Sequence, residues 1–343
     1  MTKLNKHIKI VRSSLSRLSS MSEKSCESIY NVLVKSYSHV DISIVNNLED
    51  LKDLINSRPD LVFLGMKFIP TNTGLLSSKI WISKYLDDNN VIYTGSGKSA
   101  HELEYNKHLA KQRMINFGIQ TSPFYIIKHN DTQEKYNNML RFPVFIKPTN
   151  RSGGMGIDSD SVAYNFEDLY FKVNLISTKL RSDSIVEEYL PGREFSVAIL
   201  KNHHSNRFSV MPIELIAMPD KNGISMLSKK VKSSNSECVK EVTDNIIRSN
   251  IMELSMRAFN ALGARDYGRI DIRMNENGIP QFLEANLIPS LIDKYGSFPK
   301  ACMLNISLGY EQMILNIVKL ALNRITIKEK ISTESYDLIL KNS

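Results

Sequence analysis

The sequence predicts an α/β protein whose N-terminal part forms a parallel sheet. Short apolar runs alternate with helical patterns over the first hundred residues, which is typical of parallel strands connected by helices. Near the C-terminus, GRIDIR (268–273) and QFLEAN (281–286) form the pattern of a β-hairpin. With 343 residues, the chain is too long for one simple core, so we expect two or three domains.

The N-terminal elements follow a strict alternation of strand and helix. Strands are predicted at 7–11, 40–45 and 60–64, and helices at 25–36 and 48–56. This order places the helices on the faces of a parallel sheet.

The remainder of the chain mixes helices and strands without a fixed alternation. A helix is predicted over 100–116, with Gly118 as its C-terminal cap. The other expected elements are strands at 124–127, 143–147, 184–188 and 194–200, and helices at 166–180, 244–262 and 307–323. Residues 220–241 are rich in Lys and Ser and predict a long loop or lid, whereas the segment from about 325 carries no assignment.

The composition is that of a globular protein, and it disfavours several classes of partner. The net charge of +8 would permit binding to nucleic acid or an anionic membrane. However, aromatic and basic residues are not interleaved in an RNA-binding pattern, and a nucleotide-handling enzyme also collects lysines. We therefore expect small-molecule substrates rather than nucleic acid.

Cysteine usage and the N-terminus predict a cytoplasmic protein. Cys26, Cys238 and Cys302 are widely spaced and form no CxxC pair, so neither a zinc site nor a disulfide framework is indicated. The basic N-terminus lacks an apolar core of signal-peptide length, and no run is long enough to span a membrane.

The C-terminal hairpin places oxygen ligands on one face. Strand alternation puts Arg269 and Asp271 on the same face, and likewise Glu284 and Asn286, with 275–278 as the turn. Two carboxylates and an amide suit magnesium, and Arg269 adds a fixed cation, which points to phosphate chemistry. The alternative is a surface hairpin whose polar face meets water.

A lysine followed by a glycine loop gives a second phosphate-binding pattern. Lys147 ends an apolar strand, where an unpaired buried ammonium would be costly, so an anionic partner is expected. The loop 151–156 contains three glycines and can bring backbone N–H groups close to phosphate oxygens. The alternative is an ordinary turn.

The segment 185–195 (IVEEYLPGREF) combines an apolar strand with acidic residues around a Pro-Gly turn. A purine can stack on apolar walls while backbone groups bind its edge, and Glu194 can hold ribose hydroxyls. A solvated hairpin is the alternative interpretation.

These patterns together resemble a known superfamily. Lys107, the FIKP strand with its glycine loop, EEYLPGREFSV and RIDIR…FLEAN occur in the order of an ATP-grasp enzyme, and the chain most closely resembles the D-alanine–D-alanine ligase branch from about 93 to about 323. The resemblance implies an α+β ATP-grasp architecture, an N-terminal parallel α/β domain followed by two α+β subdomains that clasp ATP, and a homodimer. The expected segments are 1–98 for the N-terminal domain, 99–190 and 191–327 for the subdomains, and 328–343 for a tail.

The resemblance also implies how ATP is bound. Lys107 and Lys147 would bind its phosphates, and the loop residues Ser152, Gly153, Gly154 and Gly156 would cover them. Backbone groups of Glu187 and Leu190 would contact adenine, and Glu194 would hold the ribose.

The implied metal and catalytic residues lie further along the chain. Asp271, Glu284 and Asn286 would bind magnesium, with two ions expected and manganese as an alternative. Arg269 and the backbone N–H of Ser290 would stabilise the tetrahedral intermediate, and Lys230 would reach the γ-phosphate. The implied reaction is carboxylate–amine ligation through an acylphosphate, with release of ADP and phosphate.

Departures from the branch concern the amino-acid substrate. Glu23 is shifted from the place of an amine-binding glutamate, and 64–74 lacks the histidine and acids that the branch carries there. The sequence therefore predicts amino-acid substrates other than D-alanine. The candidates for lining the pocket are Lys67, Asp293, Lys294 and Tyr295. Two alternatives stay open: a true D-alanine–D-alanine ligase, and an ATP-binding regulatory protein with a degenerate site.

Overall fold

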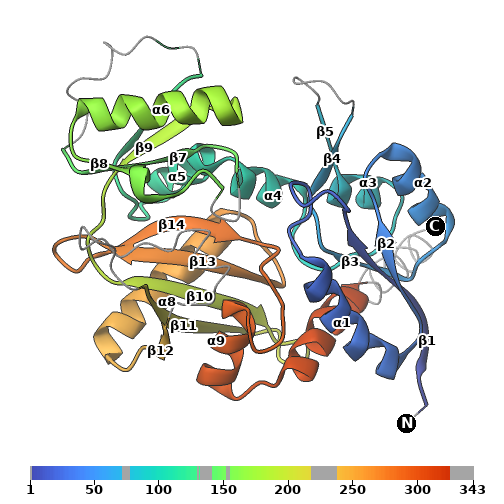
Figure 1. Cartoon of the computed structure of the whole chain (residues 1–343). Helices are drawn as coiled ribbons and strands as arrows, with labels where there is room; N and C mark the ends of the chain where they lie inside the picture. Colours follow the sequence, from blue (N-terminus) through green and yellow to red (C-terminus); the bar gives the residue numbers. More distant parts are fainter. Residues whose placement is uncertain are drawn as a thin grey trace, which may run out of the picture.

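The computed structural model describes residues 2–71, 78–129, 131, 141–151, 155–217 and 238–324. Within them, the strands form sheets of three, two, four and five strands (Figure 1). The two largest sheets lie one above the other, and the three-stranded sheet lies beside them (Figure 1).

The N-terminal sheet is parallel, as the alternation of strands and helices predicts. Its order is β2-β1-β3, with β1 (Leu4–Arg12), β2 (Tyr37–Ile44) and β3 (Leu61–Leu64). The connecting helices are α1 (Glu23–Ser36) and α2 (Leu48–Asn56). α2 begins with a capping box in which Asn47 and Asp50 each accept a hydrogen bond from the other's backbone N–H. A hairpin of β4 (Phe68–Pro70) and β5 (Lys79–Trp81) and helix α3 (Ile82–Asp88) follow, and none of these three was predicted.

The prediction of one helix over 100–116 is wrong, because the structure has two. α4 (Lys98–Tyr105) and α5 (Lys107–Asn116) are separated by Asn106, whose φ of −99° and ψ of 88° are not helical. The backbone N–H of Lys107 donates to the carbonyl of Thr149 (3.1 Å) instead of continuing the helix. Gly118, with φ of +62°, follows the end of α5, which agrees with its predicted capping position.

The four-stranded sheet is antiparallel and has helix α6 on one face. Its order is β6-β9-β7-β8, with β6 (Phe124–Ile127), β7 (Val144–Pro148), β8 (Val162–Ala163) and β9 (Ser184–Glu188). α6 (Phe166–Leu180) packs across three of these strands, as Figure 1 shows. Asn165 caps α6 by accepting from the backbone N–H of Asp168.

The five-stranded sheet is antiparallel and carries the predicted hairpin. Its order is β12-β11-β10-β13-β14, with β10 (Glu194–Lys201), β11 (Phe208–Ile216), β12 (Cys238–Glu241), β13 (Tyr267–Met274) and β14 (Pro280–Asn286). Helices α8 (Asn245–Ala261) and α9 (Ser297–Ile306) pack on this sheet, and residues 310–324 are helical. The end of the predicted loop 220–241 is strand β12, whereas 218–237 lies outside the described residues.

Three hydrophobic clusters hold these layers together. One lies under α6, a second lies between α8 and the five-stranded sheet, and the largest joins the N-terminal sheet to α9 and residues 313–321. The C-terminal helices therefore support the N-terminal sheet as well as their own sheet. The predicted domain boundaries remain predictions.

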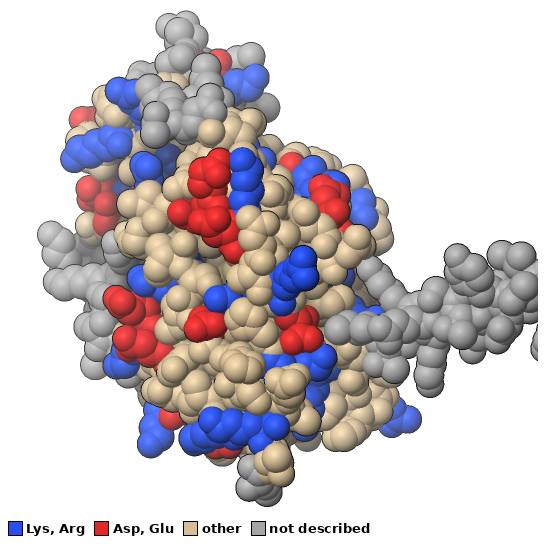
Figure 2. Space-filling model, turned by 90° about the vertical axis from the view of Figure 1, so that its right-hand side faces the viewer, with Lys and Arg blue, Asp and Glu red and all other residues tan. Residues whose placement is uncertain are grey.

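The described residues contain no helix that is long and apolar enough to cross a membrane. On the face shown in Figure 2, Lys and Arg side chains are interspersed with Asp and Glu side chains.

Candidate active site

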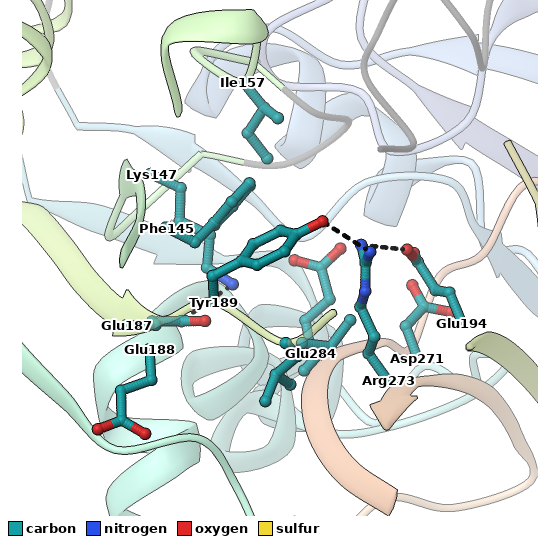
Figure 3. Close-up of a pocket in the computed structure, with 12 residues that line it drawn as sticks. Phe145, Lys147, Ile157, Glu187, Glu188, Tyr189, Glu194, Asp271, Arg273 and Glu284 are labelled. Atoms are coloured by element: carbon teal, nitrogen blue, oxygen red, sulfur yellow. Dashed lines mark hydrogen bonds and ion pairs between the residues drawn. The ribbon is translucent and has the colours of Figure 1, made fainter. Parts of the chain in front are cut away.

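A cleft of about 670 Å³ is formed by residues of the four-stranded and five-stranded sheets. Apolar and charged side chains share its lining: Phe145, Ile157, Leu190 and Leu283 are apolar, and Lys147, Glu187, Glu194, Asp271, Arg273 and Glu284 are charged (Figure 3). The structure thus brings many of the predicted residues to one place.

Lys147 lies near the end of β7, where the strand pairing with β9 directs it toward an acid. Its Nζ is 3.0 Å from Oε1 of Glu187, and both side chains are buried. Burial alone would lower the pKa of Lys147, but the carboxylates of Glu187 and Glu284 outweigh burial and hold the pKa above its usual value. Lys147 therefore stays a cation that can bind phosphate oxygens.

Lys111 is a functional candidate that the sequence did not single out. Its side chain is fully buried, its Nζ donates to Thr121 Oγ1 (2.7 Å) and Ser122 Oγ (2.8 Å), and it lies 3.6 Å from Glu187. Burial lowers the pKa of Lys111 to about 8, partly opposed by the charge of Glu187. The sequence feature that could have identified Lys111 is its spacing of four residues from Lys107, which places both lysines on one face of α5.

Lys107 connects the glycine loop with the hairpin of β13 and β14. Its Nζ donates to the carbonyl of Arg151 (2.7 Å) and lies 3.2 Å from Oε2 of Glu284. The break before α5 sets this position, because it starts the new helix at Lys107.

The structure pairs the predicted polar residues of the two hairpin strands with one another. Arg269 faces Asn286 and Asp271 faces Glu284 across β13 and β14. A β-bulge near Leu283 lies between this pair and the next, so that Ile272 faces Phe282. The polar face of the hairpin is therefore confirmed.

Asp271 is at the centre of the polar face. It accepts hydrogen bonds from Arg269 Nε (2.9 Å) and Nη2 (2.8 Å), from Asn286 Nδ2 (3.0 Å) and from Ser196 Oγ (2.9 Å). Burial alone would lower the pKa of Arg269, but the carboxylate of Asp271 outweighs burial and raises it. Arg269 therefore remains a fixed cation beside the carboxylate.

The donor set of the hairpin fits a hard divalent cation. Asp271 lies on β13, and Glu284 and Asn286 lie on the adjoining strand β14. All three side chains carry oxygens, which are the ligands that magnesium prefers. Among the described residues, no three His, Cys, Asp or Glu side chains gather into a metal site, so the amide of Asn286 is needed to complete the set. These three residues would hold the ion together with phosphate oxygens.

At the opposite end of the cleft, Arg273 contacts both a carboxylate and an aromatic side chain. Arg273 Nη1 lies 3.2 Å from Oε2 of Glu194, and Arg273 Nη2 donates to the hydroxyl of Tyr189 (3.2 Å; Figure 3). Arg273 was not predicted, although the period of two from Arg269 and Asp271 places it on their face. Glu194 and Leu190 lie in this cleft, whereas the expected backbone contacts of Glu187 and Leu190 to adenine stay a prediction.

Gly156 is the glycine of this loop that the structure describes. Its φ is +81°, and a Cβ at this position would lie 2.8 Å from Pro148 Cγ and 2.9 Å from Leu180 Cδ1. Only glycine satisfies both conditions. The predicted residues Ser152, Gly153, Gly154 and Lys230 lie outside the described residues.

The predicted substrate-pocket residues do not gather at one site. Lys67 lines a small cavity beside Glu284 and Asn286. Asp293 and Lys294 are exposed and line a different, apolar cavity with Met303. Glu23 is exposed at the start of α1, 3.6 Å from Arg12, and does not line the small cavity.

Ser290 and Tyr295 are partly buried in the segment that follows β14. This segment reaches the hairpin at Ser297, whose Oγ accepts from Arg269 Nη1 (3.1 Å). The role of the Ser290 backbone N–H stays a prediction.

Solved structures share this arrangement of sheets. The D-alanine–D-alanine ligase of Bacillus anthracis complexed with ATP superposes with a TM-score of 0.72, covering 94% of this chain and 99% of that chain at 16% identity. The ligase of Coxiella burnetii gives a TM-score of 0.69 at 17% identity and covers 98% of this chain and 99% of that chain. The fold is therefore that of the ATP-grasp proteins.

Sequence comparisons identify the family. Residues 114–319 match the family model described as D-ala D-ala ligase C-terminus, so the chain belongs to this family. It is 30% identical to the D-alanine–D-alanine ligase of Lacticaseibacillus casei over 234 residues, which span 68% of this chain but only 60% of that relative. D-alanine–D-alanine ligase B of Clostridium perfringens is 24% identical over 92% of this chain and 98% of its own length.

Proposed function

We propose that this protein is an ATP-dependent ligase that activates a carboxylate as an acylphosphate and joins it to an amine. The observation that carries the proposal is that cationic and anionic side chains lie next to each other. Lys147 and Lys107 lie beside Glu284, which belongs to the polar face of the hairpin with Asp271 and Asn286. Cations for phosphate and oxygen ligands for a metal therefore lie together, as phosphoryl transfer requires.

In the first step, an oxygen of the substrate carboxylate forms a bond to the γ-phosphorus of ATP. The bond from this phosphorus to the β–γ bridging oxygen breaks, and ADP leaves with the electron pair. Lys147 and Lys107 bind the phosphate oxygens during the transfer. Magnesium held by Asp271, Glu284 and Asn286 would neutralise charge on the phosphates.

In the second step, the amine attacks the acyl carbon, loses a proton, and phosphate leaves with the electron pair of the broken C–O bond. The oxyanion that forms needs fixed donors. Arg269 is suited to this role because two hydrogen bonds to Asp271 and one to Ser297 fix its guanidinium. The backbone N–H of Ser290 is the second proposed donor.

D-alanine is the substrate that the relatives favour for both positions. The relatives from Lacticaseibacillus casei and Clostridium perfringens are D-alanine–D-alanine ligases, and this supports D-alanine better than it supports the other amino acids predicted from the departures at 64–74. A homodimer and a cytoplasmic location stay predictions from the sequence.

The test is a measurement of ADP and phosphate release with a panel of amino acids, dipeptides and amines. D-alanine should give stoichiometric ADP and phosphate together with D-alanyl-D-alanine. Release of AMP and pyrophosphate would contradict the acylphosphate mechanism. Tight ATP binding without turnover on the whole panel would favour a regulatory protein instead.

A further inference from the structure

The described lining of the large cleft carries more acids than cations. Its cations are Lys147 and Arg273, and its carboxylates are Glu187, Glu188, Glu194, Asp271 and Glu284. Together with two neighbouring cations, they form four ion pairs: Lys147–Glu187, Lys107–Glu284, Arg269–Asp271 and Arg273–Glu194. Each pair is neutral overall, and Glu188 points away from the other labelled side chains in Figure 3. Positive charge beyond these pairs would favour a ligand that carries several phosphate charges.

Lys111 is a further cation, and it lies behind the cleft rather than in its lining. Its side chain is fully buried. Its Nζ lies 3.6 Å from Oε1 of Glu187, the same oxygen that lies 3.0 Å from Nζ of Lys147. Because one carboxylate can neutralise only one of two ammonium groups, the three side chains together carry one positive charge when both lysines are protonated.

The hydrogen bonds around Lys111 fit an ammonium group. Thr121 Oγ1 donates to the carbonyl of Phe282 (2.8 Å), so this hydroxyl accepts from Lys111 Nζ (2.7 Å). Ser122 Oγ (2.8 Å) and the carboxylate of Glu187 are two further acceptors. These three acceptors match the three N–H donors of an ammonium group. Lys111 is therefore protonated at neutral pH, although burial lowers its pKa to about 8.

We infer that Lys111 is a positioning residue for the nucleotide: its ammonium group binds Glu187 from behind and so leaves the charge of Lys147 for phosphate oxygens. This role rests on the proposed function, since it concerns how the ATP of that reaction is bound. Lys111 acts through Glu187 and Lys147, because its own side chain is buried away from the cleft. Without Lys111, the other two side chains would form a neutral pair, and the cleft would attract a polyanion less strongly.

ADP and adenosine distinguish this role from a merely structural one. They share the base and the ribose and differ in the two phosphates. A structural residue would affect the binding of both ligands alike, whereas a source of charge affects the charged ligand.

The test compares Lys111→Met with a matched control, Lys98→Met. Methionine keeps a similar length but carries no charge, and Lys98 is a partly exposed lysine of α4 beside Glu102. Calorimetry on the full-length protein with magnesium would measure binding of ADP and of adenosine. We expect Lys111→Met to weaken ADP binding by about 10-fold or more and adenosine binding by less than about twofold, and Lys98→Met to match the wild type. Equal weakening for both ligands, or unchanged ADP binding, would overturn the inference.

The double variant Lys111→Met/Glu187→Gln removes one charge of each sign. Lys147 is then no longer neutralised by Glu187, so the ratio of ADP affinity to adenosine affinity should return to within about threefold of the wild-type ratio. Using the ratio cancels any contact that Glu187 makes with adenine. A ratio no higher than that of Lys111→Met would refute a role based on charge.

The wild type alone provides a second test, in case Lys111→Met does not fold. Because burial lowers the pKa of Lys111 to about 8, raising the pH from 7 to 9.5 removes its charge. Lys147 keeps its charge, because nearby carboxylates outweigh burial and hold its pKa above the usual value. Glu187 stays ionised, because the two lysines outweigh burial and lower its pKa, and burial lowers the pKa of His108 on α5, so His108 is already neutral. ADP affinity should fall by about fivefold or more over this range while adenosine affinity stays constant; a ratio that does not change with pH would contradict the role.

Turnover separates this role from the ligase function. ADP binding that depends on Lys111, without ADP release from ATP with any acid and amine, would support this role and refute the ligase function. Turnover in which Lys111→Met has the wild-type KM for ATP would support the ligase and refute this role.

Discussion

Replacing Lys111 by methionine removes a fully buried ammonium group next to the cleft. The ordinary pKa of lysine is 10.5, and burial lowers that of Lys111 to about 8. Between these values the unfolded chain binds the proton that the folded protein has lost, so folding becomes more favourable as pH rises. The difference corresponds to about 3 kcal/mol of unfolding free energy, gained by the wild type between about pH 8 and pH 10.5.

Urea denaturation of wild type and Lys111→Met at several pH values between 7 and 10.5 measures this effect. The variant lacks the titrating group, so the unfolding free energy of the wild type minus that of the variant should rise by about 3 kcal/mol over this range. Taking the difference cancels groups that titrate equally in both proteins. Lys98→Met, in which a partly exposed lysine of α4 is lost, controls for the change in net charge. A difference that stays constant with pH would refute the reasoning.

Three further predictions concern the cleft and its loop. Asp271→Asn should lower kcat by about 1,000-fold, because the proposed metal ligand and the negative charge beside Arg269 are lost together; near-normal phosphate release with bound ATP would contradict the metal assignment. Lys147→Met should raise the KM for ATP by about 30-fold or more, measured by ATP titration, because a charge-assisted contact to phosphate is removed; an unchanged KM would remove Lys147 from the phosphate site. Gly156→Ala should destabilise the protein by about 2 kcal/mol or more in thermal denaturation, because the positive φ and the contacts with Pro148 and Leu180 add. Gly263→Ala is its matched control, since Gly263 has φ of +67° but nothing within 4 Å of an added Cβ; equal losses in the two variants would show that the close contacts contribute nothing.

The features that depend on short-range patterns were predictable from the sequence. Alternation along a strand is a local property, so the polar face with Arg269, Asp271, Glu284 and Asn286 followed from the order of residues. The parallel N-terminal sheet followed from the same kind of pattern, because its strands and helices are short and clearly separated.

Features that depend on distant partners were not predictable. Lys67 was a candidate pocket residue, but nothing in the sequence pairs it with Glu104, because their ion pair results from the packing of α4 against the segment after β3. Strand β11 was missed because it contains Pro212, which normally argues against an inner strand. In the structure, Pro212 lies one residue beyond the last residue of β11 that pairs with β12, so no hydrogen bond to β12 is lost there.

The break at Asn106 places Lys107 between the two sheets that line the cleft. Its main chain is bonded to Thr149, which follows β7 of one sheet, and its side chain to Glu284 of the other. Lys107 is thus a tether between the two walls of the cleft, and widening the cleft stretches it. A phosphate that drew Nζ away from Glu284 would replace this link by bridging the walls itself, so Lys107, like Arg273 with its hydrogen bond to Tyr189, is a side chain through which nucleotide binding would act on the separation of the sheets.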